Sequence, residues 1–587
     1  MPSPVGSYLQ RVHDELLGMR AGEVADYIPA LAAADPEPFG ICLATVDGAV
    51  YAVGDADREF TIQSISKPFT YALAIADRGL DEVLDHIGVE PSGEAFNQIS
   101  LDRHGRPRNP MINAGAIAAA SLVEGADPFG RILDWYGRWA GRELRLDTEV
   151  YAGESETGHR NRAIAHLLRS GGVVGGDPER ALDAYFRQCS VLVTARDLAV
   201  MAATLAARGR HPTTGETLAE GPVVDQVLSV MTTCGMYDGA GRWLVDVGMP
   251  AKSGVAGGVI GVLPGQLGIA VFSPRLDEVG NSARGVAAFQ RIAADLQLHF
   301  LHAGRPAGRT VARTYSVSAA PSTRRRGPDA RRALDAATDR SVVLEIVGEV
   351  VFSGAEAIAR RVAREPATLV VLDLARATQV DDAATDLLGT LAAQLAEQGR
   401  TLVVAGLPDA PAGVRAFAGL DEAKEWCEDE LLGAAGVVER DGPVSLDEHP
   451  LGAALTTADR EALRGLAAAR RFAPGEILVR RGDRATSIFA LLDGEAEVVL
   501  PQAAGGPGGQ RRLTTLAAGS TFGESAISGG ARTADIVALT AGELLEIDTV
   551  ALERGDPGLR AAIYAYLLRV SHEALERATR RIDALAT

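Results

Sequence analysis

A stretch rich in arginine, proline, glycine and serine interrupts the chain between about Gly304 and Asp335 and limits how it can fold. No apolar periodicity runs through it, and it carries eight arginines: Arg305, Arg309, Arg313, Arg324, Arg325, Arg326, Arg331 and Arg332. A hydrophobic core cannot continue through such a segment. The 587 residues are also too many for one core, since domains commonly hold about 100 to 200 residues. The sequence therefore predicts several domains and, at residues 304–336, a solvated flexible linker.

Charge and cysteine content narrow the class of protein. The formal net charge of -19 argues against a nucleic acid or an anionic membrane surface as partner, because phosphate binding needs a basic face. Four widely separated cysteines (Cys42, Cys189, Cys234, Cys427) fit free thiols better than a disulfide framework or a zinc site. The N-terminus has no basic region followed by an apolar one. We therefore expect a cytoplasmic protein with no metal ion.

One uncharged stretch, residues 253–274, is long enough to span a bilayer. It is broken by six glycines and by Pro264, and its apolar residues fall into two runs, 259–263 and 267–272, on either side of Pro264-Gly265-Gln266. This pattern is typical of strand, turn and strand. We predict a buried hairpin and no membrane insertion.

The C-terminal half divides once more. Strands predicted at 341–351, 367–374 and 401–405 alternate with helices around 358–363 and 382–398, which favours a small α/β domain at 337–440. A linker is predicted at 441–459. Residues 460–587 have short strands separated by glycine turns, which indicate a β-roll, and then a long helix at 559–585 with Leu559, Ile563, Leu567, Val570, Leu575 and Ile582 on one stripe.

The first 303 residues contain a Ser-x-x-Lys motif, Ser64 to Lys67. On one helical turn these two side chains share a face, and a buried lysine of lowered pKa can remove the proton of the serine hydroxyl. The motif alone is common by chance, and Pro68 disfavours helix at Lys67 unless the helix is only beginning there. Lys252-Ser253-Gly254, which opens the predicted hairpin, is a second element of Ser–Lys acyl-transfer enzymes of the β-lactamase and transpeptidase type.

A series of further motifs appears in one order across residues 20–300. They are Tyr27-Ile28-Pro29, Gln63 to Pro68, Asn109 to Ala116, Glu154 to Asn161, Cys234 to Asp238, Ala251 to Gly258 and Gly280-Asn281-Ser282. Together they resemble the landmarks of the serine-dependent glutaminases, and Pro68 belongs to that family's pattern. The resemblance implies an α/β domain of β-lactamase/transpeptidase type at residues 1–303 that hydrolyses L-glutamine to L-glutamate and ammonia.

The resemblance also implies residue roles. Ser64 would be the nucleophile and Lys67 its base, with Tyr237 as proton relay and Tyr27 beside them. The backbone N–H groups of Ser64 and Val255 would form the oxyanion hole. The remaining substrate contacts would be Asn113, Glu154, Asn161 and Tyr185. Glutamine is a zwitterion, so Glu154 suits its ammonium group, and the amide and phenol groups suit its carboxylate. Taken singly, Asn113 could equally cap a helix, Tyr185 could be a core residue and Glu154 a solvated charge.

The two C-terminal domains also resemble known families. Residues 337–440, with Val370 to Leu374 followed by Val380 to Ala384, resemble a STAS domain, although a generic α/β packing domain is the alternative. Asp382 and Ala383 stand where phosphorylated members carry serine or threonine, so we expect no phosphoswitch. Residues 460–587 resemble the cyclic-nucleotide-binding β-roll with its C-terminal helices. There the resemblance implies contacts to cyclic AMP or cyclic GMP from Gly523, Glu524, Ser525, Arg532 and Thr533.

These features give a main hypothesis and two alternatives. The main hypothesis is a glutaminase without a catalytic cofactor, regulated by a cyclic nucleotide and by a protein partner at the STAS domain. The family resemblance implies a homodimer or homotetramer. The first alternative is a nucleotide-sensing scaffold whose glutaminase domain is inactive. The second is an enzyme of the same fold that acts on a β-lactam or a peptide.

Overall fold

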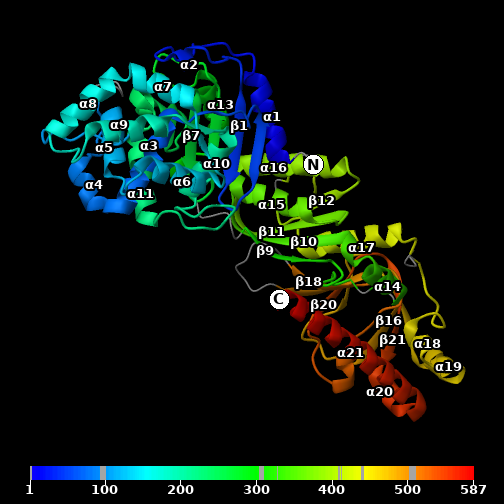
Figure 1. Ribbon diagram of the computed structural model, residues 1–587. Helices are drawn as coiled ribbons and strands as arrows, with labels where there is room; N and C mark the ends of the chain where they lie inside the picture. The colour runs from blue at the N-terminus through cyan, green and yellow to red at the C-terminus, as the bar shows by residue number, and fades with distance from the viewer. Residues whose placement is uncertain are drawn as a thin grey trace. The chain divides into compact units, whose positions relative to one another are not determined.

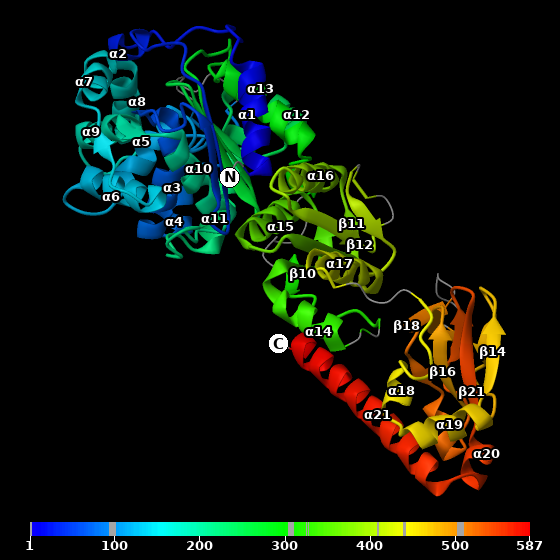
Figure 2. The same cartoon turned by 90° about the vertical axis from the view of Figure 1, so that its right-hand side faces the viewer.

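The computed structural model describes residues 3–92, 101–302, 310–324, 326, 328–407, 410–411, 413–437, 442–501 and 510–586. The chain packs as two compact units. The first comprises Met1–Val311, Val347–Ala363 and Ala377–Gln394, and the second comprises Ala312–Ile346, Arg364–Arg376 and Leu395–Thr587. Figures 1 and 2 label the helices and strands in two views.

The N-terminal region is built on a five-stranded antiparallel sheet in the order β2-β1-β8-β7-β6. The strands are β1 (Gly40–Thr45), β2 (Val50–Gly54), β6 (Ala251–Gly254), β7 (Gly258–Leu263) and β8 (Leu267–Phe272). Every residue of β7 and β8 is buried, and the two strands pair across a tight turn. The buried hairpin predicted from the uncharged stretch is therefore present.

Helices cover both faces of this sheet. Helix α10 (Ala195–Ala206) packs on β1, β7 and β8, whereas α1 (Pro4–Leu16) and α13 (Ala283–Asp295) lie on the other side (Figures 1 and 2). Helix α10 is apolar almost all round and nearly every residue is buried, as expected of a helix enclosed in a core. Its close approach depends on Gly268, where a Cβ atom would lie 2.3 Å from the backbone nitrogen of Ala203.

Most of the remaining helices of this region form a layer beyond α10 and hold the site described below, whereas α12 (Ala240–Asp246) contacts α13 through the Trp243 and Phe289 rings (Figure 2). The other helices are α2 (Pro29–Ala32), α3 (Ser66–Arg78), α4 (Leu80–His86), α5 (Asn113–Leu122), α6 (Pro128–Ala140), α7 (Thr148–Thr157), α8 (His159–Ser170), α9 (Pro178–Cys189) and α11 (Gly221–Cys234). Short 3-10 turns are η1 (Gln63–Ile65), η2 (Tyr237–Gly239) and η3 (Phe300–His302), and a small sheet joins β3 (Phe60–Thr61), β5 (Val191–Val193) and β4 (Arg145–Leu146).

A second five-stranded sheet has the order β13-β12-β11-β10-β9. Its strands are β9 (Val311–Tyr315), β10 (Ser341–Val350), β11 (Leu369–Val380), β12 (Thr401–Ala405) and β13 (Arg415–Phe417), and its helices are α14 (Pro328–Ala336), α15 (Phe352–Arg364), α16 (Asp382–Ala396) and α17 (Leu420–Ala434). Strands β11, β12 and β13 run parallel. Helices α14 and α17 share one apolar cluster with Val343, Val371 and Val403. These three residues come from β10, β11 and β12 and face the same side of the sheet.

The C-terminal region is a roll of two four-stranded sheets, β14-β21-β16-β19 and β15-β20-β17-β18. The strands are β14 (Ala468–Phe472), β15 (Ile477–Val479), β16 (Ser487–Asp493), β17 (Ala496–Pro501), β18 (Gln510–Leu516), β19 (Thr521–Phe522), β20 (Asp535–Ala538) and β21 (Gly542–Asp548). Helices α18 (Pro450–Ala453), α19 (Thr457–Leu466), α20 (Thr549–Arg554) and α21 (Pro557–Ala586) accompany them, as does the 3-10 turn η6 (Glu524–Ser528).

Two expectations for this region need correction. On α21, Leu559, Ile563 and Leu567 are buried, but Leu575 is 65% exposed and does not belong to the same buried stripe. Residues 441–459 were predicted to be a linker; among those described, Leu446 and Leu451 join an apolar core cluster. Short polar stretches surround Leu446 and Leu451, so composition alone does not indicate that these two residues pack in a core.

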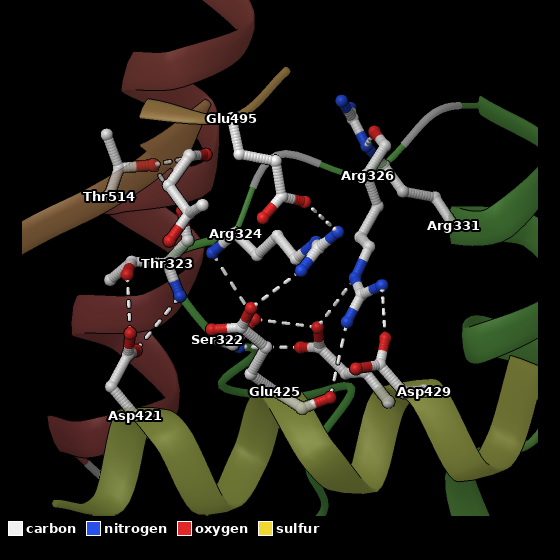
Figure 3. Close-up of polar contacts among 12 residues, drawn as sticks. Ser322, Thr323, Arg324, Arg326, Arg331, Asp421, Glu425, Asp429, Glu495 and Thr514 are labelled. Carbon is white, nitrogen blue, oxygen red and sulfur yellow. Dashed lines mark hydrogen bonds and ion pairs between the residues drawn. The ribbon is translucent and has the colours of Figure 1, made fainter. Parts of the chain in front are cut away.

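The arginine-rich segment also differs from the solvated tether that its composition predicts. Residues 303–309, 325 and 327 lie outside the described part. Of the others, Val311–Tyr315 form β9 and Pro328–Ala336 form α14. The Arg326 side chain is buried against the carboxylates of Glu428 and Asp429 on α17 (Figure 3). Neutralisation by these acids makes burial of the guanidinium tolerable.

Within the described residues, no helix combines the length and the apolar character needed to cross a bilayer.

Candidate active site

Ser64 and Lys67 lie where η1 runs into α3, and both side chains are almost fully buried. Helix α3 begins at Ser66, so Pro68 falls in its first turn, where backbone N–H groups have no partner within the helix. Gln63, just before the serine, has a φ of 49°, a backbone conformation that residues other than glycine adopt rarely. Such outliers cluster at functional sites because the surrounding fold must hold them.

The Lys67 ammonium group is enclosed by protein. Its Nζ donates to Asn113 Oδ1 at 2.7 Å, and Asn113 stands at the first turn of α5. Burial lowers the pKa of Lys67 from its usual 10.5 to about 8, although the Glu154 carboxylate acts in the opposite direction. A lysine in this range is deprotonated often enough to act as a base.

The Tyr237 side chain contacts the Ser64 hydroxyl. Burial raises its pKa, and a hydrogen bond with the Ser64 hydroxyl partly opposes this. Its own hydroxyl also donates to the carbonyl oxygen of Ser253 on β6 at 3.1 Å. Like Gln63, Tyr237 has a positive φ, here 53°. The structure thus brings the Ser64 and Tyr237 hydroxyls together, and Lys67 follows on the first turn of α3.

Lys252 is a further buried group that was not assigned a role from the sequence. Its Nζ lies 4.4 Å from the centroid of the Tyr237 ring and donates to the carbonyl oxygens of Gly235 at 3.0 Å and Ser253 at 2.7 Å. Burial, with the nearby Lys67 charge, holds the pKa of Lys252 well below its usual value. Its position on the Lys-Ser-Gly strand was the available sequence signal.

Glu154 on α7 provides a buried carboxylate beside these groups. Its Oε1 accepts a hydrogen bond from the Tyr27 hydroxyl at 3.2 Å, and the same hydroxyl lies 3.3 Å from Gln63 Oε1. Burial raises the pKa of Glu154, against the hydrogen bonds from Tyr27 and Gln63 and the charge of Lys67. Gln63 was missed as a site residue, since nothing in its spacing distinguishes it from its neighbours.

Three other residues are predicted to contact the substrate: Asn161, Tyr185 and Val255. Asn161 on α8 accepts from Asn113 Nδ2 at 3.1 Å. Tyr185 on α9 is buried, and its pKa is raised by that burial and by the neighbouring Cys189 and Glu154. Val255 follows β6 directly and packs on Ile28. The end of β6 approaches η1 closely, since a Cβ on Gly254 would lie 3.0 Å from the Ile62 carbonyl oxygen.

A cavity of 520 Å³ adjoins this cluster. Tyr237 and Ile112, the residue before Asn113, are among the residues that line it, together with Thr233 and Cys234 at the end of α11. Its volume is in the range of small-molecule sites. Of the predicted site residues, Tyr237 is the one among the residues that line this cavity, so the cavity lies beside the buried cluster that holds the nucleophile, the lysine of lowered pKa and the carboxylate.

The predicted nucleotide-contacting residues lie together in the C-terminal roll. Gly523 adopts the left-handed conformation at the start of η6, and Glu524, Ser525 and Thr533 are at least partly exposed. Arg532 is 7% exposed; its guanidinium donates to the carbonyl oxygens of Gly523 at 3.1 Å and Ser487 at 2.7 Å and lies over the Phe489 ring. A phosphate would have to compete with these carbonyl groups for Arg532.

Comparisons with known proteins agree with this geometry. The family model described as Glutaminase matches residues 22–301, that of the Mlab STAS domain matches 334–433, and that of the cyclic nucleotide-binding domain matches 469–554. Glutaminase 2 of Bradyrhizobium diazoefficiens is 41% identical over 99% of this chain and 96% of its own length. The chain belongs to the glutaminase family. It is an enzyme with a glutaminase domain and two regulatory domains, and the predicted multidomain fold is confirmed.

Two further relatives support the glutaminase domain. The glutaminase of Corynebacterium glutamicum is 51% identical over 52% of this chain and 76% of its own length. A crystal structure of Mglu in its glutamate form matches with a TM-score of 0.51 and 41% identity, covering 70% of this chain and all of the Mglu chain.

The pH dependence of glutamine hydrolysis should report the pKa of Lys67. The lysine can accept a proton only when it is neutral, so kcat/KM should fall about tenfold per pH unit well below the pKa of about 8 and level off above it. Initial rates of ammonia release between pH 5.5 and 9.5 would measure this. A profile that is flat across pH 8 would contradict the assignment of Lys67 as the titrating base.

Proposed function

We propose that the glutaminase domain hydrolyses L-glutamine by an acyl-enzyme mechanism with Ser64 as nucleophile. The observation that carries the proposal is the contact between the Ser64 and Tyr237 hydroxyls. Ser64 also stands three residues before Lys67, whose pKa is lowered by burial. Neutral Lys67 takes the hydroxyl proton as Ser64 Oγ attacks the side-chain amide carbon. The tetrahedral oxyanion is held by the backbone N–H groups of Ser64 and Val255.

The next steps release ammonia and then glutamate. As the C–N bond breaks, the nitrogen leaves as ammonia with the proton that Lys67 took up, relayed through the Tyr237 hydroxyl. Water then attacks the ester at Ser64 and gives up a proton to Lys67. As the C–O bond to Ser64 breaks and glutamate is released, Lys67 returns this proton to Ser64 Oγ and the free enzyme is regenerated. No step requires a cofactor or a metal ion.

Substrate orientation follows from the buried carboxylate. Glu154 binds the α-ammonium group of glutamine, and this positive charge offsets the cost of keeping the carboxylate away from water. Asn113, Asn161 and Tyr185 donate hydrogen bonds to the α-carboxylate. A β-lactam or a peptide has no free amino-acid end for these groups, and the family relatives that align over the whole chain are glutaminases, so neither alternative function is favoured.

Ser64→Ala should abolish glutamine hydrolysis. Loss of the nucleophile from a serine hydrolase lowers kcat by about 10⁴-fold or more. Ammonia release from L-glutamine by wild type and variant would measure the loss, with nitrocefin as a second substrate to test the β-lactam alternative. If the variant kept wild-type turnover, or if only nitrocefin were cleaved, the proposed mechanism would fail.

Glu154→Gln should weaken substrate binding more than it slows chemistry. A lost charge-assisted hydrogen bond is worth roughly 1.5–3 kcal/mol, so kcat/KM should fall about 10- to 150-fold, mainly through KM. The exposed Glu156 on the same helix is the matched control, and Glu156→Gln should leave both constants unchanged. An unchanged KM in Glu154→Gln would contradict the role of this carboxylate.

We infer that a cyclic nucleotide bound beside Gly523, Glu524, Ser525, Arg532 and Thr533 regulates the enzyme. In this proposal the phosphate replaces the carbonyl partners of the Arg532 guanidinium, and Glu524 accepts from the ribose 2′-hydroxyl. Support comes from the match to the cyclic nucleotide-binding family and from the contacts of the Arg532 guanidinium with the Gly523 carbonyl oxygen and the Ser525 hydroxyl at the start of η6.

Saturating cyclic AMP or cyclic GMP should change glutamine turnover at least twofold in the wild type and not in Arg532→Ala. Arg471→Ala is the control, because Arg471 is an exposed arginine of the same domain, 86% exposed at its side chain. Binding should be confirmed separately by calorimetry. Nucleotide that binds without changing the rate would refute the regulation and leave the glutaminase mechanism intact.

A further inference from the structure

The second compact unit contains a cavity of 460 Å³ that is separate from the catalytic cluster. Its walls come from residues 317–324, from α14 and α17 of the STAS domain, and from β18 and α21 of the cyclic nucleotide-binding domain. Apolar side chains line much of it: Val317, Leu334, Leu431 and Leu513. Both the volume and the apolar lining are typical of small-molecule sites.

A network of charged hydrogen bonds fixes the walls of this cavity (Figure 3). The Ser322 N–H and hydroxyl both donate to the Glu428 carboxylate at 2.6 Å. Arg324 donates to Glu425 of α17 and to Glu495 between β16 and β17, each at 2.8 Å. The Thr514 hydroxyl of β18 donates to the Thr323 carbonyl oxygen. Residues 322–324 are therefore held by the STAS domain on one side and by the cyclic nucleotide-binding domain on the other.

Most charges in this network are already neutralised by one another. Arg326 pairs with Glu428 at 3.0 Å and Asp429 at 2.6 Å, and Arg324 pairs with two glutamates. These arginines and carboxylates hold the walls of the cavity together, so we do not expect them to bind a ligand. Carboxylates outnumber guanidinium groups here, so a purely anionic ligand would meet net repulsion.

Two charged residues of α14 also line the cavity and stand apart from that network. Arg331 and Asp335 are four residues apart, which places them on one face of the helix. Arg331 Nε donates to the Arg326 carbonyl oxygen at 2.9 Å, and its side chain lies on the far side of Arg326 from α17 (Figure 3). Within the described residues neither Arg331 nor Asp335 takes part in an ion pair.

We propose that this cavity binds an α-amino acid with an apolar side chain. The terminal nitrogens of Arg331 would donate to its carboxylate, and Asp335 would accept from its ammonium group. Its side chain would pack on Leu334, Leu431 and Leu513. A zwitterion satisfies the unpaired cation and anion together, whereas a simple acid or amine satisfies only one of them. This proposal is independent of glutamine hydrolysis.

Binding would favour the contact between the two regulatory domains, because the ligand touches walls from both. A ligand that binds only this arrangement stabilises it by an amount that grows with the logarithm of its concentration. The cavity would thus let the level of an amino acid influence how the regulatory domains associate.

Calorimetry with the full chain tests the ligand class. The probes are L-phenylalanine, 3-phenylpropanoate, which lacks the ammonium group, and 2-phenylethylamine, which lacks the carboxylate. We expect saturable binding of L-phenylalanine and at least tenfold weaker binding of the other two. No binding of L-phenylalanine, or equal binding of 3-phenylpropanoate, would overturn the proposal.

Variants of α14 locate the site. Arg331→Met and Asp335→Asn should each weaken L-phenylalanine binding at least tenfold. The controls are Arg332→Met and Asp329→Asn, a pair on the same helix whose side chains are 77% and 82% exposed, and they should bind as the wild type does. Arg331→Lys keeps the charge and should lose less affinity than Arg331→Met. Unchanged binding in both cavity variants would place L-phenylalanine elsewhere and refute the site.

Discussion

The removal of the Lys67 ammonium group from water is the constraint on which the catalytic region depends. A buried ammonium is costly, and the protein meets that cost with one short hydrogen bond to Asn113 and with the opposing charge of Glu154. Both partners are themselves buried and come from different helices, α5 and α7. The helical layer beyond α10 must therefore be assembled before the lysine has the environment that lowers its pKa.

The same packing holds two backbone conformations that a free chain would avoid. Gln63 and Tyr237 have positive φ on either side of Ser64, and each carries a hydrogen bond that a relaxed conformation would lose. Lys252 lies over the Tyr237 ring and ties β6 to the loop after α11. The geometry of the site is thus set by contacts among distant parts of the chain rather than by the Ser-x-x-Lys turn alone.

In the C-terminal half, apolar clusters form the cores of the domains, and charge neutralisation orders the arginine-rich segment against them. The acidic face of α17 binds the arginine-rich segment through Asp421, Glu425, Glu428 and Asp429. The composition of this segment predicts exposure to solvent, but its acidic partners on α17 hold it against the domain. These partners lie about a hundred residues later in the chain, so the local sequence does not reveal them. This ordered segment also lines the cavity between the two regulatory domains.

The sequence by itself determined that the chain has several domains and that β7 and β8 form a buried hairpin, and it predicted the Ser64 and Lys67 pair, because hydrophobic periodicity, turn residues and motif spacing are local signals. The family resemblance also predicted Asn113 and Glu154 as substrate contacts, and both lie beside Lys67 in the structure. Only the tertiary structure decided that Gln63 and Lys252 lie beside these residues, that Leu575 leaves the buried stripe of α21 and that Arg326 is buried. Those outcomes depend on which charged or apolar partner lies opposite in space, and no local pattern encodes a partner a hundred residues away.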